Sequence, residues 1–187
     1  FSMVWSKPVE RMREFLLAIR AIWRTWQTGE ELSFHGEFYT HSLMIPIFDP
    51  GPNEFAVPPI YLAGVSPRMV EAVGEVADGF IIHPLHSPSF LETETIPALE
   101  RGLAKGGRSR KDVPISCQTI VALGGTPAQI ETARQKARWA IAYFGSSFRG
   151  PMEHHGYGAL HLELERLRKA ADWSEMVKRI DDTLFDH

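Results

Sequence analysis

The sequence predicts an α/β fold with a parallel sheet, because one pattern of residues occurs three times. Each time, a short apolar run is followed by a turn, a Ser or Thr, a proline and a helical stretch. The runs and their capping pairs are 59–64 with Ser66-Pro67, 79–84 with Ser87-Pro88, and 115–123 with Thr126-Pro127. Ser or Thr followed by proline is typical of a helix start. Strands joined by helices run parallel, so the turns after them should meet at one edge, where sites are built.

The part of the chain before these repeats has two different characters. An amphipathic helix is predicted over Ser6–Trp26, with tryptophans on its core face, arginines on its solvated face and Gly29 after its end. The segment 29–58 is rich in proline and also apolar. We expect it to be a long non-regular excursion that is ordered by the packing of its apolar side chains.

Helices dominate the rest of the chain. The helix after the second strand should be interrupted at Pro97, and the helix after Thr126 should extend to about Phe144. Two further helices are predicted, over Ala159–Ala170 and from the capping box Asp172-x-x-Glu175 to about Phe185.

The number of strands leaves two architectures open. A closed eight-stranded barrel takes about 250 residues and cannot be completed by three strands. The chain is therefore either an unusual open sheet or a partial (β/α)8 barrel whose first strands and last strand are missing. On the second interpretation, residues 1–187 form a single incomplete barrel domain, with the excursion at 29–58 and a helical C-terminal segment at 151–187.

Composition excludes several classes of protein. The chain has 187 residues, 44% hydrophobic and 23% charged, which is typical of a globular domain and not of a disordered one. No apolar run is long enough for a membrane span. The net charge of −3 does not provide the excess of positive charge that is typical of proteins that bind nucleic acid. The single cysteine, Cys117, allows no internal disulfide, which favours a cytoplasmic setting. Since Cys117 lies in the third strand, we expect it to be a small buried side chain.

The turn after the first strand is the first candidate site. It contains the small residues Ala63, Gly64, Val65 and Ser66, which allow another molecule to approach the backbone. The helix that follows presents N–H groups to an anion. This arrangement predicts a seat for a phosphate or a flavin ring; the alternative is an ordinary tight turn with a serine cap. Without a G-x-G-x-x-G pattern, a dinucleotide fingerprint is excluded.

Histidines supply the second candidate site. His83 and His86 follow the second strand and are weak candidates for catalysis, by proton transfer or by orienting a substrate; the alternative is that they bond only to loop carbonyls. Gln118 and Thr119 of the third strand are candidates for a polar group in a barrel mouth. The cluster from Glu153 to His155 has no zinc-site spacing, so we expect no metal. Gly156-Tyr157-Gly158 and the histidines before it are interpreted as a mobile lip over a pocket; the alternative is a plain connection between two helices.

Two segments, Pro58–Pro67 (PPIYLAGVSP) and Ala77–Pro84 (ADGFIIHP), resemble the luciferase-like monooxygenase family, and in particular its branch that depends on the deazaflavin coenzyme F-420. Three other segments resemble the same family in the same order: Trp5–Met12, Phe34–Tyr39 and Gly106–Arg108. The resemblance covers nearly the whole chain. It is specific in the combination and order of the segments, although each alone is short.

The resemblance implies a (β/α)8 barrel that holds FMN or a deazaflavin at the C-terminal ends of its strands. Residue by residue, it implies that Ala63, Gly64, Val65 and Ser66 contact the ring or its phosphate, and it places His83 near the same mouth. The family's first four strands have no counterpart before Phe1, and its last strand has none after His187. We therefore expect self-association or a homo-oligomer, because unpaired strand edges and an uncovered interior favour it.

The function implied for the parent protein is hydride transfer between coenzyme F-420, an 8-hydroxy-5-deazaflavin, and a small organic substrate. One alternative is an FMN-dependent luciferase-like monooxygenase that uses oxygen. The other is a truncated, non-catalytic protein that binds flavin or a partner, and the missing strands leave the activity of the 187-residue chain itself open. We expect a small-molecule substrate as a partner, and neither nucleic acid nor a membrane.

Overall fold

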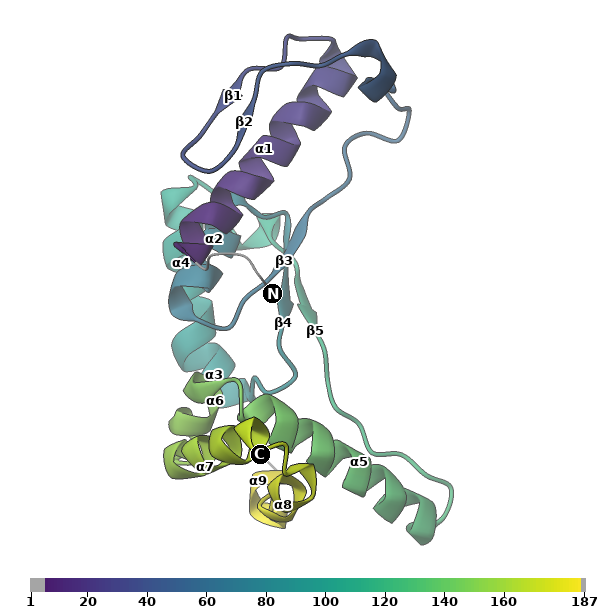
Figure 1. The fold of residues 1–187 in the computed structure, drawn as a ribbon, viewed down its shortest axis with the longest axis vertical. Coiled ribbons are helices and arrows are strands. Elements are labelled where there is room, and N and C mark those ends of the chain that lie inside the picture. Colours follow the sequence, from purple (N-terminus) through teal and green to yellow (C-terminus); the bar gives the residue numbers. More distant parts are fainter. Residues whose placement is uncertain (1–5, 186–187) are drawn as a thin grey trace. The chain divides into compact units, whose positions relative to one another are not determined.

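The computed structural model describes residues 6–185 and confirms the α/β class (Figure 1). The contacts within the chain divide it into two units, which we name the N-terminal unit (6–81 and 98–116) and the C-terminal unit (82–97 and 117–185). Trp5, which begins one of the family-like segments, lies outside the described residues. The assignment of 1–187 to one barrel domain stays a prediction.

The strands are short. They are β1 (Phe34–His35), β2 (Thr40–His41), β3 (Tyr61–Ala63), β4 (Gly79–Ile82) and β5 (Ile115–Cys117). The first two form an antiparallel hairpin, and the other three form a sheet in the order β3-β4-β5. β3 and β4 pair in parallel, as the pattern predicts, with Tyr61 opposite Gly79 and Ala63 opposite Ile81.

Two helices of the N-terminal unit cover one face of this sheet (Figure 1). They are α2 (Pro67–Val76) and most of α4 (Ile96–Lys105), and their apolar side chains form a core with Phe80 of β4. Gly74 and Gly102 allow the two helices to touch backbone to backbone, because an added Cβ would collide with the carbonyl of Leu99 or of Glu71. Tyr61 and Ala63 of β3, which alternate with the helix-facing Leu62, are exposed.

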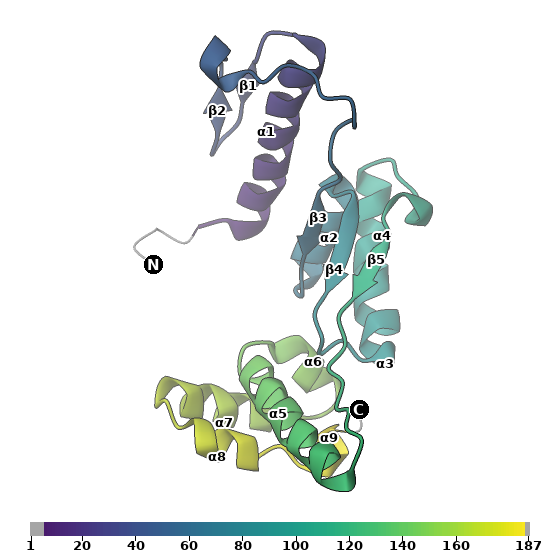
Figure 2. The same ribbon diagram turned by 90° about the vertical axis from the view of Figure 1, so that its right-hand side faces the viewer.

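The first helix, α1, extends over Pro8–Thr28 and ends at Gly29, as the sequence predicts (Figure 2). It begins two residues later than predicted, at Pro8, and Lys7 stands at the cap position with a left-handed backbone (φ 40°). The arginines are not simply solvated, since Arg13 pairs with Glu75 at 2.8 Å and Arg20 pairs with Asp78 at 2.8 Å. These ion pairs tie α1 to α2 and to the residue that precedes β4.

The prediction that packing of apolar side chains orders the excursion after α1 holds only in part. Leu32 is buried, Phe34, Phe38, Tyr39 and Met44 are partly buried, and the Tyr39 ring lies 5.7 Å from that of Phe15. Ile47, Phe48 and Phe55 are 82%, 67% and 85% exposed. The carboxylate of Glu14 instead accepts hydrogen bonds from the backbone N–H groups of residues 37, 38 and 39, at 2.9, 2.7 and 2.6 Å. One charged side chain on α1 therefore anchors the hairpin that a hydrophobicity argument could not place.

The C-terminal unit is helical apart from the strand ends that enter it. Its elements are α3 (Pro88–Phe90), a π-helical turn (Leu91–Thr95), α5 (Pro127–Gly145), α6 (Arg149–His154), α7 (Gly158–Lys169), α8 (Trp173–Lys178) and α9 (Asp182–Phe185). Figure 2 shows α5, α7 and α8 gathered together, and their core includes Ile141, Leu164 and Met176. No helix among the described residues is long and apolar enough to cross a membrane.

Three predicted elements of this part of the chain change in detail. The interruption expected at Pro97 is the π-helical turn just before it, where Ile96 N–H donates to Leu91 O. Proline has no N–H to continue the α-helical ladder, and the wider turn accommodates this. β5 ends at Cys117 instead of continuing to Leu123, and Cys117 is exposed rather than buried. The last helix is divided into α8 and α9.

Candidate functional site

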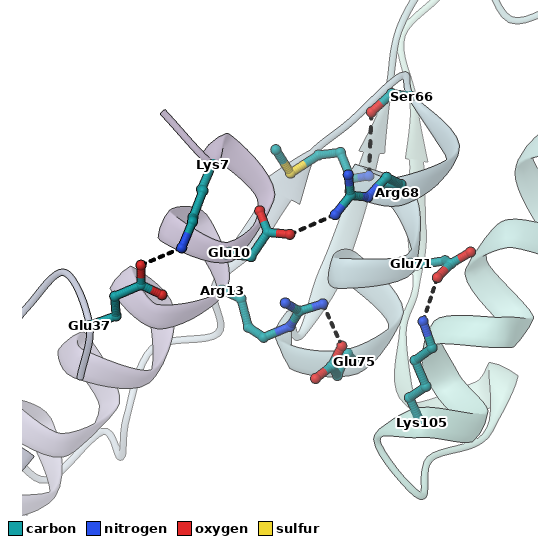
Figure 3. Close-up of polar contacts among 10 residues, drawn as sticks. Lys7, Glu10, Arg13, Glu37, Ser66, Arg68, Glu71, Glu75 and Lys105 are labelled. Atoms are coloured by element: carbon teal, nitrogen blue, oxygen red, sulfur yellow. Dashed lines mark hydrogen bonds and ion pairs between the residues drawn. The ribbon is translucent and has the colours of Figure 1, made fainter. Parts of the chain in front are cut away.

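The turn between β3 and α2 is open to solvent. Ala63 and Ser66 are exposed, and Gly64 and Val65 are partly exposed. Ser66 Oγ accepts a hydrogen bond from Met69 N at 3.4 Å, and Ser66 O accepts one from Val70 N at 3.0 Å (Figure 3). The structure therefore confirms the predicted serine cap at the start of a ten-residue helix.

Gly64 lies close to the side chain of Met69, which would have to shift if a larger residue stood here. A Cβ added at Gly64 would lie 2.9 Å from Met69 Cγ and 3.4 Å from the Met69 carbonyl carbon. The residue after β3 is thus in contact with the first helical turn of α2. The backbone of the connecting residues 63–66 stays on the surface. Nearby, Arg68 pairs with Glu10 at 2.6 Å, so this cation is already balanced by a carboxylate (Figure 3).

The turn after β4 is packed, in contrast, and its two histidines differ in their surroundings. His83 lies against the rings of Phe144 and Phe148, with centroids 4.7 and 4.0 Å away, and its Nδ1 accepts from Leu85 N at 3.2 Å. Burial, with a smaller contribution from the neighbouring His86, lowers the pKa of His83 to about 4. The ring is therefore neutral at pH 7.

His86 lines a cavity of about 700 Å³ that lies entirely within the C-terminal unit. Its Nδ1 is 2.9 Å from His83 O, and burial lowers the pKa of His86, although this hydrogen bond acts in the opposite direction. Most of the cavity wall is apolar, and its polar members include Ser87, Cys117, Gln118, Thr119, Arg134 and His155. A cavity of this size and polarity is typical of a site for a small organic molecule.

A chain of hydrogen bonds fixes the rim of this cavity. Ser87 Oγ accepts from Phe90 N at 3.2 Å, as the cap of α3, and lies 2.7 Å from His155 Nε2. His154 Nε2 lies 2.9 Å from Ser89 Oγ. The histidines at the end of α6 are thus joined to the serines at the start of α3.

Sequence reasoning placed some of these residues and missed others. His86, Gln118 and Thr119 do line one cavity, and His155 borders it. Ser87 and Arg134 were not singled out, since a Ser-Pro pair signals only a cap and an arginine in a helix only a solvated face. Among the described residues, no group of three or more side chains is arranged to hold a metal ion. The cofactor-binding and catalytic assignments stay predictions.

Comparisons with known proteins identify relatives that are about twice as long. The chain is 46% identical over 187 residues to an uncharacterized protein of Mycobacterium tuberculosis, covering 99% of this chain and 55% of the relative. It is 28% identical over 191 residues to the 5,10-methylenetetrahydromethanopterin reductase of Archaeoglobus fulgidus, covering 98% and 53%. It is 31% identical over 165 residues to the F-420-dependent glucose-6-phosphate dehydrogenase of Nakamurella multipartita, covering 88% and 45%. The chain thus spans about half the length of these relatives.

A solved structure shares the fold. The coenzyme F-420-dependent tetrahydromethanopterin reductase from Methanopyrus kandleri superposes with a TM-score of 0.70 at 15% sequence identity, covering 95% of this chain and 48% of the other. This match to about half of a larger structure fits the predicted partial (β/α)8 barrel. The luciferase-like monooxygenase family model matches residues 1–187. The chain therefore belongs to the luciferase-like monooxygenase family.

Proposed function

We propose that this chain provides the cofactor-binding turn of an oxidoreductase that uses coenzyme F-420 to transfer a hydride to or from a small organic substrate. One observation carries the site: the turn 63–66, made of small residues, is open to solvent at the start of a ten-residue helix. Three similar proteins support the choice of cofactor: an F-420-dependent glucose-6-phosphate dehydrogenase, a methylenetetrahydromethanopterin reductase, and the F-420-dependent tetrahydromethanopterin reductase that shares the fold.

The residues of this turn fit an anionic or ring-shaped group. Exposed Ser66 can donate its hydroxyl proton to a phosphate oxygen while its oxygen still accepts from Met69 N. The N-terminal end of α2 adds the positive end of the helix dipole, which favours a negative charge at this position. Gly64 leaves the backbone uncovered by any side chain. A bound deazaflavin would supply the hydride chemistry; the protein would supply its seat and orientation.

Titration of the protein with coenzyme F-420 and, separately, with FMN tests this proposal. We expect Ser66→Ala to lower the affinity for F-420 by about one to two decades, because it removes a hydrogen bond to a charged group. Thr126→Ala is the matched control, since Thr126 caps α5 in the same way, accepting from Gln129 N at 3.3 Å. It should cost a similar stability of about 1 kcal/mol and leave cofactor affinity unchanged.

Two outcomes would contradict the proposal. Unchanged affinity in Ser66→Ala, with a lowered melting temperature, would leave Ser66 as a structural cap only. FMN binding with rapid consumption of oxygen by the reduced flavin would instead support an FMN-dependent monooxygenase, which the family's name favours.

A further inference from the structure

We propose that Ser87 and His155 form a nucleophile and its general base, and that they hydrolyse an uncharged ester whose apolar acyl chain lies in the cavity of the C-terminal unit. This second activity of the chain needs no cofactor. It rests on the hydrogen bonds of Ser87, on the place of both residues in the cavity, on a neighbouring hydrogen-bond donor and on the apolar wall.

The hydrogen bonds of Ser87 direct its hydroxyl proton toward His155. Ser87 Oγ accepts a hydrogen bond from Phe90 N at 3.2 Å and lies 2.7 Å from His155 Nε2. Its third contact, with Ser89 Oγ, is 3.3 Å long, whereas a hydrogen bond from a hydroxyl group to another oxygen spans about 2.5–3.0 Å. Among the described residues, His155 Nε2 is therefore the best acceptor for this proton. A histidine that accepts the proton of a serine activates that serine as a nucleophile.

The pair is accessible from the cavity. Ser87 and His155 both line the volume of about 700 Å³, and both are partly exposed. Ser87 precedes α3 and His155 follows α6, and these two elements belong to the same unit. The His154 ring lies edge-on to the His155 ring, with centroids 4.9 Å apart, and so restricts its orientation. A ligand in the cavity thus meets a serine and a histidine that are already in hydrogen-bond contact.

Ser89 supplies a hydrogen-bond donor beside the nucleophile. Its Oγ lies 3.3 Å from Ser87 Oγ and 2.9 Å from His154 Nε2. When His154 donates to Ser89 Oγ, the hydroxyl proton of Ser89 is available for another acceptor. Attack on an ester places negative charge on the former carbonyl oxygen, and a donor next to the attacking atom stabilises this charge.

The wall selects the acyl group. Leu85, Ile120 and Met152 are among the apolar side chains that line the cavity. A charged ester would lose hydration against them, which is unfavourable without a compensating group. Arg134, the arginine of this wall, pairs with Asp182 at 3.1 Å, so its charge is already balanced. The cavity therefore favours an uncharged ester with a long apolar acyl chain.

The reaction is an acyl transfer followed by hydrolysis, and no atom changes its oxidation state. Ser87 Oγ forms a bond to the carbonyl carbon while its proton passes to His155 Nε2. The bond from that carbon to the alcohol oxygen breaks, and the alcohol takes the proton from His155. Water then gives a proton to His155 and attacks the acyl group. The bond to Ser87 Oγ breaks, Ser87 regains the proton, and the carboxylic acid leaves.

Hydrolysis of 4-nitrophenyl octanoate and of 4-nitrophenyl acetate tests the proposal, with release of 4-nitrophenol as the measurement. We expect kcat/KM to be at least about tenfold higher for the octanoate, because its chain is buried against the apolar wall. A fluorophosphonate with an alkyl chain should form a stable bond to Ser87, as peptide mapping by mass spectrometry would detect. This mapping uses the unaltered protein, so it decides the question even where a variant does not fold.

Variants locate the two roles. Ser87→Ala should abolish the activity. His155→Gln keeps a hydrogen-bonding side chain that cannot take up the proton, so kcat should fall about a hundredfold or more while KM changes little. Thr126→Ala is the matched control, because it removes a helix cap of the same kind at the start of α5 and should keep the activity.

The proposal is overturned if the protein accelerates neither ester, if the acetate is cleaved as fast as the octanoate, or if a folded Ser87→Ala or His155→Gln variant keeps full activity. Acylation of Cys117, the exposed cysteine of the same wall, in place of Ser87 overturns it as well. No cofactor is present in these measurements, so failure of the F-420 titration and failure of this test are separate results.

Discussion

The turns at Ser66 and Ser87 have the same local sequence plan and opposite surroundings. Both follow a strand of the same sheet, and in both a serine caps a helix whose first residue is proline. The turn at Ser66 is exposed and holds no titratable group between Ala63 and Ser66. The turn at Ser87 is packed against histidine and phenylalanine rings from α5 and α6. Residues close in the sequence determine the helix cap. Residues distant in the sequence determine whether the turn stays exposed on the surface or becomes part of a cavity wall.

The largest expected effect comes from filling the exposed turn. In Gly64→Val the branched side chain would press on Met69 and cover the backbone that the proposed cofactor approaches. We expect cofactor affinity to fall by about a hundredfold or more and stability by about 1–3 kcal/mol. Affinity is measured by titration and stability by urea unfolding.

The matched control for this change is Gly125→Val, in the turn before α5. There an added Cβ meets only Gln129 Oε1, at 3.4 Å. Stability should change by no more than about 0.5 kcal/mol, and cofactor affinity should be unaffected. Equal losses of cofactor affinity in the two variants would contradict the proposal that the turn at Gly64 binds the cofactor.

A smaller effect separates the two serines by stability alone. Ser87→Ala removes both a helix cap and the contact with His155, so we expect a loss of about 2 kcal/mol. Ser66→Ala removes an exposed cap only and should cost about 1 kcal/mol. Urea unfolding of both variants measures the difference. A loss at Ser66 as large as that at Ser87 would show that packing around the second turn adds nothing to its cap.

A further effect, of similar size, is a dependence of stability on pH that only the packed turn should show. Burial, aided by His86, lowers the pKa of His83 from 6.5 to about 4, so the unfolded chain binds a proton there while the folded one does not. This contribution is complete above about pH 6.5 and is lost as the pH falls toward 4. Allowing for the partial exposure of the ring, we expect a loss of about 1–2 kcal/mol.

The difference in stability between the unaltered protein and His83→Phe, measured from pH 7 to pH 4, isolates this contribution. Phenylalanine fits beside Phe144 and Phe148 but cannot titrate. The difference should change steadily across this range, and the NMR signals of the His83 ring should titrate near pH 4. Titration of His83 near pH 6.5 would contradict the burial of the ring.

Sequence reasoning predicted those parts of the fold that depend on neighbours in the chain. Ser66, Ser87 and Thr126 all cap helices as expected, because a cap needs only its own N–H partners three residues on. The strand predicted over 115–123 was too long: it is β5, which ends at Cys117. Its partner β4 itself ends at Ile82, so it offers no further backbone to pair with. Apolar residues beyond Cys117 thus line a cavity instead of extending a ladder.

Contacts between distant residues were beyond such reasoning. Nothing near Glu14 in the chain indicates that its carboxylate binds residues 37 to 39, and nothing near His155 indicates Ser87 as its partner. The same limit applies to the candidate site. The pattern placed His86 after a strand, but the wall contributed by α5 and α6 emerges only from packing.

The bond between Glu14 and the hairpin has an evolutionary consequence. A side chain at Gly36 would collide with the Glu14 carboxylate, which cannot move aside without losing its three N–H partners. Replacing either residue alone therefore disrupts the hydrogen bonds between the Glu14 carboxylate and residues 37 to 39. A shorter acidic residue at position 14 would instead leave room for a side chain at position 36. Across related sequences these two positions, 22 residues apart, are expected to change together and not one at a time.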